Sequence, residues 1–187
     1  MVSTIGNVLF LGGRECLIDV PQNVVQCFET YRNADHFGID ARSDLLVLCD
    51  TNGGTLPHEV NTIMGTLDHE ALSPLGVHFH NDCGVADANS LAGVLSGAVQ
   101  VQGTVNGWGE RCGNSNLCVV IPNLCLKTRH SVAMADRLEH LTSLSRFVAE
   151  KANIIPDKRQ PYVGEAAFSH KGGQHADVLQ KAEFLME

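Results

Sequence analysis

Two histidines, His78 and His80, are the residues whose spacing most directly indicates chemistry. They end an apolar segment that begins at residue 75, and residues i and i+2 of a β-strand point to the same face. Both imidazoles could therefore bind one divalent ion. Two histidines on an ordinary packed or solvated strand face explain the same spacing, so both interpretations stay open. Imidazole and oxygen ligands suit Zn, Mn, Co or Fe, and Mg less naturally.

Polar residues near the histidines could complete such a site. Asn81 and Asp82 follow directly and could supply oxygen ligands or accept hydrogen bonds from the imidazoles. Asn114 lies in a glycine-rich segment and could offer its carbonyl oxygen to a metal. The G-x-G-x-x-x-G spacing of that segment, without a suitably placed acid, argues against a dinucleotide-binding loop. Glu110 and Arg111 could equally form an ordinary ion pair.

Three further segments carry reactive groups with a plain structural alternative. The hydroxyl of Thr51 could bind a substrate carboxylate, or it could cap a turn. Segment 169–175, which ends at His175, is dense in proton-transfer groups, although a surface loop explains its composition too. Cys112 has no base placed to activate it, so we interpret it as structural. The seven cysteines include no Cys-x-x-Cys pair, which is typical of a reducing cytosol.

These groups are predicted to meet at one edge of a parallel sheet. The expected strands are 45–49, 75–80 and 99–105, with helices over 57–67 and 85–99 and a further helix from 117 to 126 that Pro122 interrupts. Alternating strands and helices are typical of parallel βαβ units and of the α/β class. Since ligands of α/β folds bind at the carboxyl edge of the sheet, the polar strand ends mark the expected site.

The chain changes character near residue 130. Apolar residues at helical spacing predict an amphipathic helix over 134–150, which is followed by a proline-containing connector over 153–161 and a second helical pattern over 176–185. These differences place a boundary near residue 130.

Composition excludes several classes of protein. The 187 residues are 44% hydrophobic and carry a formal charge of −8, with no cluster of Lys and Arg. A globular protein without a nucleic-acid or membrane partner is therefore expected. The longest apolar runs, 45–49 and 117–121, are far shorter than the roughly 20 residues of a membrane span. The N-terminus has no basic residue before its apolar run, so it is a poor signal peptide, and a cytoplasmic location is expected.

Three segments together resemble one family of enzymes. They are 48–57 with Asp-Thr-Asn-Gly-Gly, 76–90 with His-Phe-His-Asn-Asp, and 102–114 with Gly-Glu-Arg-Cys-Gly-Asn. They resemble the 2-isopropylmalate synthase family, which includes homocitrate and citramalate synthases, and the first segment is most similar to the citramalate branch. Residues 161–175 extend the resemblance, which covers about residues 44–182.

The resemblance implies a fold and a set of site residues. It implies a TIM (β/α)8 barrel followed by a helical subdomain, with the last three barrel strands in 44–130, post-barrel helices in 131–187, and a poorly matching segment in 1–43. A divalent metal (Zn, Mn, Co or Mg) would be bound by His78 and His80, with Asn114 at or near the ion. Thr51 would hold the carboxylate of a 2-oxo acid. His175 would act catalytically across a homodimer.

The implied reaction is a Claisen condensation of acetyl-CoA with a 2-oxo acid in branched-chain amino-acid biosynthesis. Pyruvate, giving citramalate on the route to isoleucine, is favoured, and 2-oxoisovalerate, giving 2-isopropylmalate on the route to leucine, comes next. A related acyl-CoA lyase is the second enzyme hypothesis, although Gly107–Cys112 departs from the Gly-Gly-Cys-Pro loop of 3-hydroxy-3-methylglutaryl-CoA lyases. A non-catalytic remnant is the third hypothesis, and a dehydrogenase is the least favoured.

The chain also departs from the family pattern. The family's Arg-Asp-Gly segment, with a catalytic Arg and a metal-binding Asp, is not found here. Residues 34–37 echo a segment before the family's sixth strand, but too few residues separate them from Leu45 for a parallel crossover. We therefore expect a fragment with weak or no activity alone, because three parallel strands cannot close a barrel.

Overall fold

A computed structural model describes residues 15–19, 45–67, 74–128, 130, 132 and 135–169, and for 15–19 and Leu46 it describes the backbone alone. The chain divides into two compact units, 1–136 and 137–187, and each is described by itself. The division of the chain at residues 43 and 130 stays a prediction. Within the described ranges, no helix combines the length and apolar character that crossing a membrane requires.

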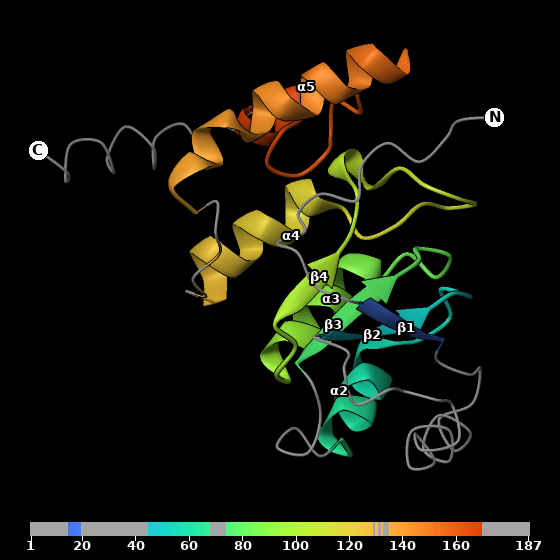
Figure 1. Cartoon of the computed structure of the whole chain (residues 1–187). Helices are drawn as coiled ribbons and strands as arrows, with labels where there is room; N and C mark the ends of the chain where they lie inside the picture. The colour runs from blue at the N-terminus through green and yellow to red at the C-terminus, as the bar shows by residue number, and fades with distance from the viewer. Residues whose placement is uncertain are drawn as a thin grey trace, which may run out of the picture. The chain divides into compact units, whose positions relative to one another are not determined.

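The first unit is built on a four-stranded sheet in which all neighbours are parallel (Figure 1). The strands follow chain order: β1 (Glu15–Asp19), β2 (Leu45–Asp50), β3 (Leu75–Phe79) and β4 (Gln100–Gln102). Helix α2 (Pro57–Gly65) connects β2 to β3, and helix α3 (Ala86–Leu95) connects β3 to β4. The predicted α/β class with parallel strands is confirmed.

Strand β1 corrects the expectation of three strands. It pairs with β2 in parallel, from Glu15 beside Leu45 to Asp19 beside Cys49. The crossover between them runs through residues 20–44, which lie outside the described residues. A parallel crossover needs a dozen or more residues, so the space is sufficient. The expected shortage was wrong because it was measured from residues 34–37 rather than from the end of β1.

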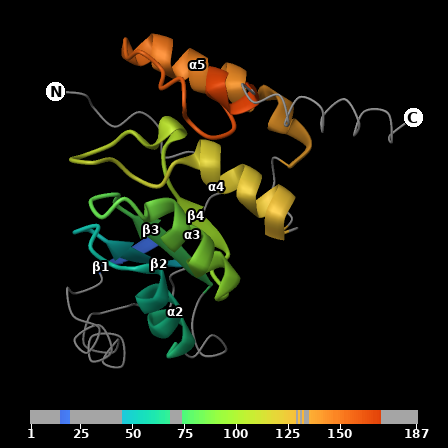
Figure 2. The ribbon, with the colours of Figure 1, turned by 180° about the vertical axis from the view of Figure 1, so that it is seen from behind.

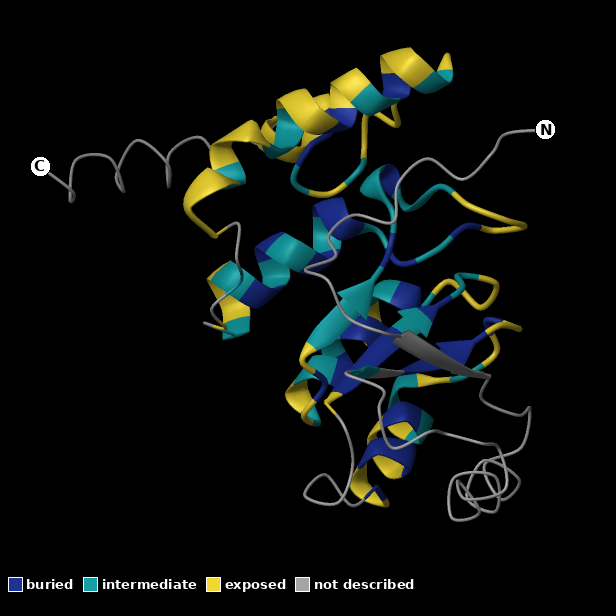
Figure 3. Ribbon diagram, viewed as in Figure 1, coloured by how far each residue is buried: buried dark blue, intermediate teal, exposed yellow. Residues whose placement is uncertain are grey.

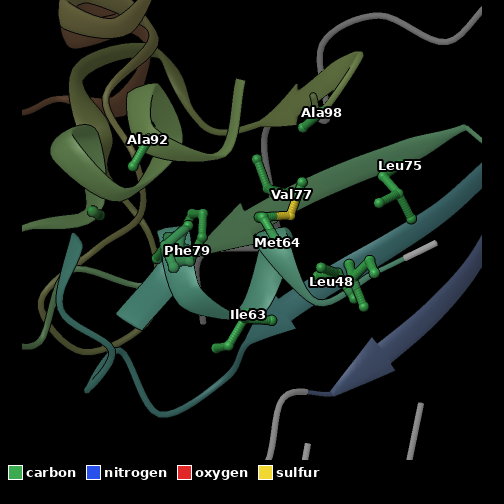
Figure 4. Packing of buried hydrophobic residues seen from close by; sticks show 11 residues of the cluster. Leu48, Ile63, Met64, Leu75, Val77, Phe79, Ala92 and Ala98 are labelled. Atoms are coloured by element: carbon green, nitrogen blue, oxygen red, sulfur yellow. The ribbon is translucent and has the colours of Figure 1, made fainter. Parts of the chain in front are cut away.

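Helices α2 and α3 cover one face of the sheet with a continuous apolar core (Figure 4). The strands contribute Leu48, Leu75, Val77 and Phe79, and the helices contribute Val60, Ile63, Met64, Ala86 and Ala92. A side chain at Gly93 of α3 would lie 3.0 Å from Val77, so glycine there permits close packing of helix on strand. Figure 3 shows β2 and β3 as largely buried strands, as their continuous apolar runs predict.

Helix α4 (Leu117–Asn123) follows the long loop after β4. It begins at Asn116, whose side chain accepts a hydrogen bond from Cys118 N at 2.9 Å, a typical N-cap. Pro122 lies inside α4, and the chain continues into a π-helical turn, Leu124–Thr128. The proline therefore does not end the helical segment here, although it lacks a backbone donor.

The second unit is helical in its described part. Helix α5 (Leu141–Ala152) follows the 3₁₀ helix η4 (Ala135–His140) and ends at Asn153, which is left-handed with φ 55°. A second 3₁₀ helix, η5, covers Glu165–Phe168. The helix expected over 176–185 lies outside the described residues. Figure 2 shows the reverse view of these elements.

Candidate metal and substrate site

The two histidines lie side by side on the face of the sheet opposite α2 and α3. His78 is in β3 and His80 follows the end of that strand. Their ring centroids are 5.2 Å apart, with the ring planes at 65°. Burial lowers the pKa of His78, and the charge of a protonated His80 would lower it further. Both effects favour the neutral imidazole, which is the form that binds metals.

Hydrogen bonds orient His78 from both of its nitrogens. Nδ1 lies 3.1 Å from Oε1 of Gln102, and Nε2 lies 3.3 Å from Nδ2 of Asn114. An amide oxygen only accepts and an amide nitrogen only donates, so this arrangement requires a proton on Nδ1 and a lone pair on Nε2. The lone pair of Nε2 accepts a hydrogen bond from Asn114 here, and a metal ion bound at Nε2 would take the place of that hydrogen bond.

Sequence reasoning missed Gln102. It lies in β4 directly beside His78 in the parallel register. No local signal marks it, because its role depends on how two strands that are 24 residues apart are paired.

The residues present fit a divalent metal ion. Nδ1 of His80 is buried and has no hydrogen-bond partner among the described residues, an arrangement that leaves a polar atom for a ligand or an outside group to satisfy. Two imidazoles and an amide form a donor set that suits transition metals. Across the described ranges, no group of three His, Cys, Asp or Glu residues forms a site by itself. Further ligands would have to come from substrate, water or other parts of the protein.

The glycine-rich loop after β4 is shaped to bring Asn114 to the histidines. A Cβ on Gly109 would overlap Oδ1 of Asn114, and a Cβ on Gly113 would overlap the carbonyl of Gly107. Asn114 also forms an isolated antiparallel bridge with His80. The glycines therefore permit close backbone approach within the protein itself. This explains their density without a dinucleotide.

Thr51 lies exposed in the loop after β2, at the same carboxyl edge. The buried carboxylate of Asp50 shapes this loop by accepting hydrogen bonds from Thr55 N at 2.9 Å and Gly54 N at 3.4 Å. The carbonyl of Thr51 accepts a hydrogen bond of 2.7 Å from Nη2 of Arg111. The loop is thus fixed in place, while the proposed carboxylate-binding role of Thr51 stays a prediction.

The structure gives Asn81 and Asp82 partners within the protein, and it gives Arg111 a second partner besides the one expected. Arg111 binds Asp82 through two hydrogen bonds of 2.8 and 2.9 Å, and it also forms the expected ion pair with Glu110, at 3.7 Å. This contact holds the pKa of Asp82 below its ordinary value. Asn81 accepts a hydrogen bond from Ala86 N at the start of α3. Cys112, interpreted as structural, is exposed. His175 lies outside the described residues.

The fold and the site define an α/β barrel-type protein with polar groups at the carboxyl edge of its parallel strands. Residues 19–148 match the family model described as HMGL-like. The chain therefore belongs to the HMGL-like family. The match includes residues 19–43, which we expected to match poorly.

Two (R)-citramalate synthases are similar in sequence to this chain. The (R)-citramalate synthase of Geobacter sulfurreducens is 54% identical over 142 residues, which are 76% of this chain and 27% of that protein. The (R)-citramalate synthase of Synechocystis is 48% identical over 155 residues, 79% of this chain and 28% of that protein. The chain thus spans about a quarter of the length of these relatives.

Solved structures support the fold. The HMG-CoA lyase of Bacillus subtilis matches with a TM-score of 0.58 at 21% identity, over 76% of this chain and 51% of that structure. Because the identity is low, this likeness shows the shared fold alone. It confirms the predicted partial TIM barrel.

Proposed function

We propose that this chain carries the metal-binding edge of an acyltransferase that condenses acetyl-CoA with a 2-oxo acid. The observation that carries the proposal is the meeting of His78, His80 and Asn114 at the carboxyl edge of the sheet. The names of the relatives reported above support citramalate synthesis, in which the 2-oxo acid is pyruvate. Synthesis of 2-isopropylmalate from 2-oxoisovalerate is the next choice of substrate.

The residues have separate tasks in this proposal. His78, His80 and Asn114 would hold a divalent ion, either Zn, Mn, Co or Mg, and Gln102 would orient His78 through Nδ1. When bound, such an ion supplies Lewis acidity to the oxo group under attack. The hydroxyl of Thr51 would hold the carboxylate of the 2-oxo acid and so align its oxo carbon. His175 would transfer a proton, reached across a homodimer.

The chemistry balances as a condensation followed by a hydrolysis. A base removes a proton from the acetyl methyl group, and the resulting carbon forms a bond to the oxo carbon of the 2-oxo acid. The former oxo oxygen gains a proton and becomes a hydroxyl. Water then cleaves the thioester and releases CoA and a second carboxylate. The described residues align the 2-oxo acid, and the base that accepts the methyl proton lies elsewhere.

Activity is expected from a longer polypeptide or a complex that includes this chain. The relatives are about three times as long, so the rest of a barrel, and with it an acetyl-CoA site, would come from outside these 187 residues. We propose weak or no turnover by this chain alone. A homodimer, a cytoplasmic location and a place in branched-chain amino-acid synthesis belong to the same proposal.

A metal-dependent acyl-CoA lyase is the second candidate. A solved HMG-CoA lyase shares the fold, which by itself does not assign that activity. The identity to the citramalate synthases is more than twice as high, which supports the synthase. A remnant without catalysis is the third possibility, and binding of metal separates it from the other two.

Titration with Mn²⁺ tests the metal site directly. The wild-type chain should bind Mn²⁺, and His78→Ala should lower the affinity by more than about a hundredfold, beyond the usual effect of changing a residue that only supports a ligand. His58→Ala is the matched control, because His58 is exposed in α2 and far from β3 in sequence. No binding by the wild type, or equal binding by His78→Ala, would reject the site. Release of CoA in the presence of acetyl-CoA and pyruvate then tests turnover.

A further inference from the structure

One guanidinium joins the loops that follow three neighbouring strands. Arg111, in the loop after β4, donates Nε to Oδ1 of Asp82 at 2.8 Å and Nη2 to Oδ2 at 2.9 Å. Asp82 lies in the loop after β3. The same Nη2 donates to the carbonyl of Thr51, in the loop after β2, at 2.7 Å. We call this group, Asp82, Arg111 and the Thr51 carbonyl, the loop clamp.

The geometry of the loop clamp is specific to arginine. Two parallel hydrogen bonds to a carboxylate need the planar fork of a guanidinium, which a lysine lacks. Arg111 also has a φ of 53°, in the left-handed region that side chains other than glycine rarely occupy. The bonds to Asp82 and Thr51 are contacts that help to hold it there.

The loop after β2 is fitted closely against Asp82. Gly53 has a φ of 65°, and a Cβ at this position would lie 2.5 Å from Oδ2 of Asp82. The carbonyl of Gly53 accepts a hydrogen bond of 3.1 Å from Cys83 N. Glycine at position 53 therefore permits the contact between the two loops, and the clamp then fastens it.

The clamped loops carry the proposed ligands. Asn81 N, one residue before Asp82, donates to the carbonyl of Gly113 at 2.9 Å, and Asn114 follows Gly113. His80 N reaches back to the carbonyl of Asp50 at 3.4 Å. Backbone hydrogen bonds therefore connect the loop clamp to the proposed metal-binding residues, and Thr51 is itself part of the clamp.

We propose that the loop clamp sets the distance between Thr51 and the metal-binding residues, so that the carboxylate and the oxo group of a 2-oxo acid are bound at the same time. This inference rests on the proposed function. The carboxylate and the oxo group of a 2-oxo acid sit on adjacent carbons, so the groups that bind them must keep a fixed separation. Nε and Nη2 of Arg111 are already engaged with protein atoms. Nη1 lies 3.7 Å from Oε2 of Glu110. We therefore assign Arg111 as a positioning residue.

The test separates metal binding from 2-oxo acid binding. Mn²⁺ affinity is measured by electron paramagnetic resonance, and pyruvate affinity by the relaxation that bound Mn²⁺ imposes on the pyruvate methyl protons. Arg111→Met and Arg111→Lys should weaken pyruvate binding to the Mn²⁺-loaded chain by about tenfold, the effect of losing a charge-assisted hydrogen bond. Mn²⁺ affinity should change less than pyruvate affinity, because His78 is held within β3 and not by the clamp. Arg146→Met, which removes an exposed charge from α5, should change neither.

Amide hydrogen exchange provides a readout that needs no ligand. Exchange at Cys83 N, the amide bonded to Gly53, should be faster in Arg111→Met and Asp82→Asn than in the wild type. Unchanged exchange together with unchanged pyruvate affinity would overturn the clamp while leaving a functional metal site. Failure of the wild type to bind Mn²⁺ would instead overturn the proposed function, and the clamp's role in it with it.

Discussion

The two faces of the sheet differ in what their side chains do. Toward α2 and α3, Val77 and Phe79 are buried in an apolar cluster. On the opposite face, Val47 and Gly76 form one row, and His78 with Gln102 forms the next row toward the carboxyl edge. Residues that are neighbours in sequence thus alternate between packing and polar contacts. A single strand, β3, therefore contributes side chains both to the apolar core of this unit and to its proposed metal site.

Truncating the helix-covered face should give the largest effect. Phe79 is 4% exposed, so Phe79→Ala leaves a cavity and should lower the free energy of unfolding by about 3–5 kcal/mol, measured by urea denaturation. Phe79→Leu keeps most of the volume and should cost about 1 kcal/mol. The folded fraction of either variant should bind Mn²⁺ as the wild type does. A large loss of Mn²⁺ affinity in the folded Phe79→Leu variant would show that the two faces are not separable.

A substitution on the opposite face should lower Mn²⁺ affinity and leave the apolar core intact. Gln102→Leu keeps the approximate size but removes the acceptor for Nδ1 of His78, so Mn²⁺ affinity should fall by about 10- to 100-fold. Calorimetric titration measures this directly. Gln100→Leu is the matched control, since it makes the same substitution on the same strand face one row away, beside Gly76. Equal losses of Mn²⁺ affinity in both variants would show that the effect comes from removing any polar side chain on this face. It would then not come from the orientation of His78.

The sequence was sufficient for the features that depend on local pattern. Continuous apolar runs predicted β2 and β3, and the i, i+2 spacing placed His78 and His80 on one face. Strand β1 was missed because Glu15–Asp19 holds only three apolar residues between two acids. Five residues of that kind do not stand out from a loop without the pairing partner in β2.

Contacts between side chains of separate elements could not be predicted from the sequence. Gln102 meets His78 only through the register of β3 and β4. Arg111 forms the expected ion pair with its neighbour Glu110, but its hydrogen bonds go to Asp82, which is 29 residues away. Arg111 also has a left-handed backbone with φ 53°, which is rare for a residue other than glycine.

The smallest expected effect on stability comes from Asp87, a polar residue of α3. Its carboxylate contacts the loop before α4. Burial raises the pKa of this carboxyl, although Oδ1 accepts a hydrogen bond of 2.6 Å from Asn116 N that opposes the rise. Since the folded pKa is above the unfolded one, the unfolded chain releases this proton first. The contribution of Asp87 to stability is therefore present below the unfolded pKa and is lost as the pH rises through the folded pKa.

Asp87→Asn should remove this dependence and keep an acceptor for Asn116 N. The difference in free energy of unfolding between this variant and the wild type should grow in the variant's favour as the pH rises from about 4 to neutrality. Urea denaturation across this range measures it, with Asp136→Asn as the control at an exposed carboxyl. A difference that stays constant with pH would mean that the hydrogen bond from Asn116 N fully compensates the burial of Asp87. Burial of the Asp87 carboxylate would then cost no stability, as burial of the apolar core side chains costs none.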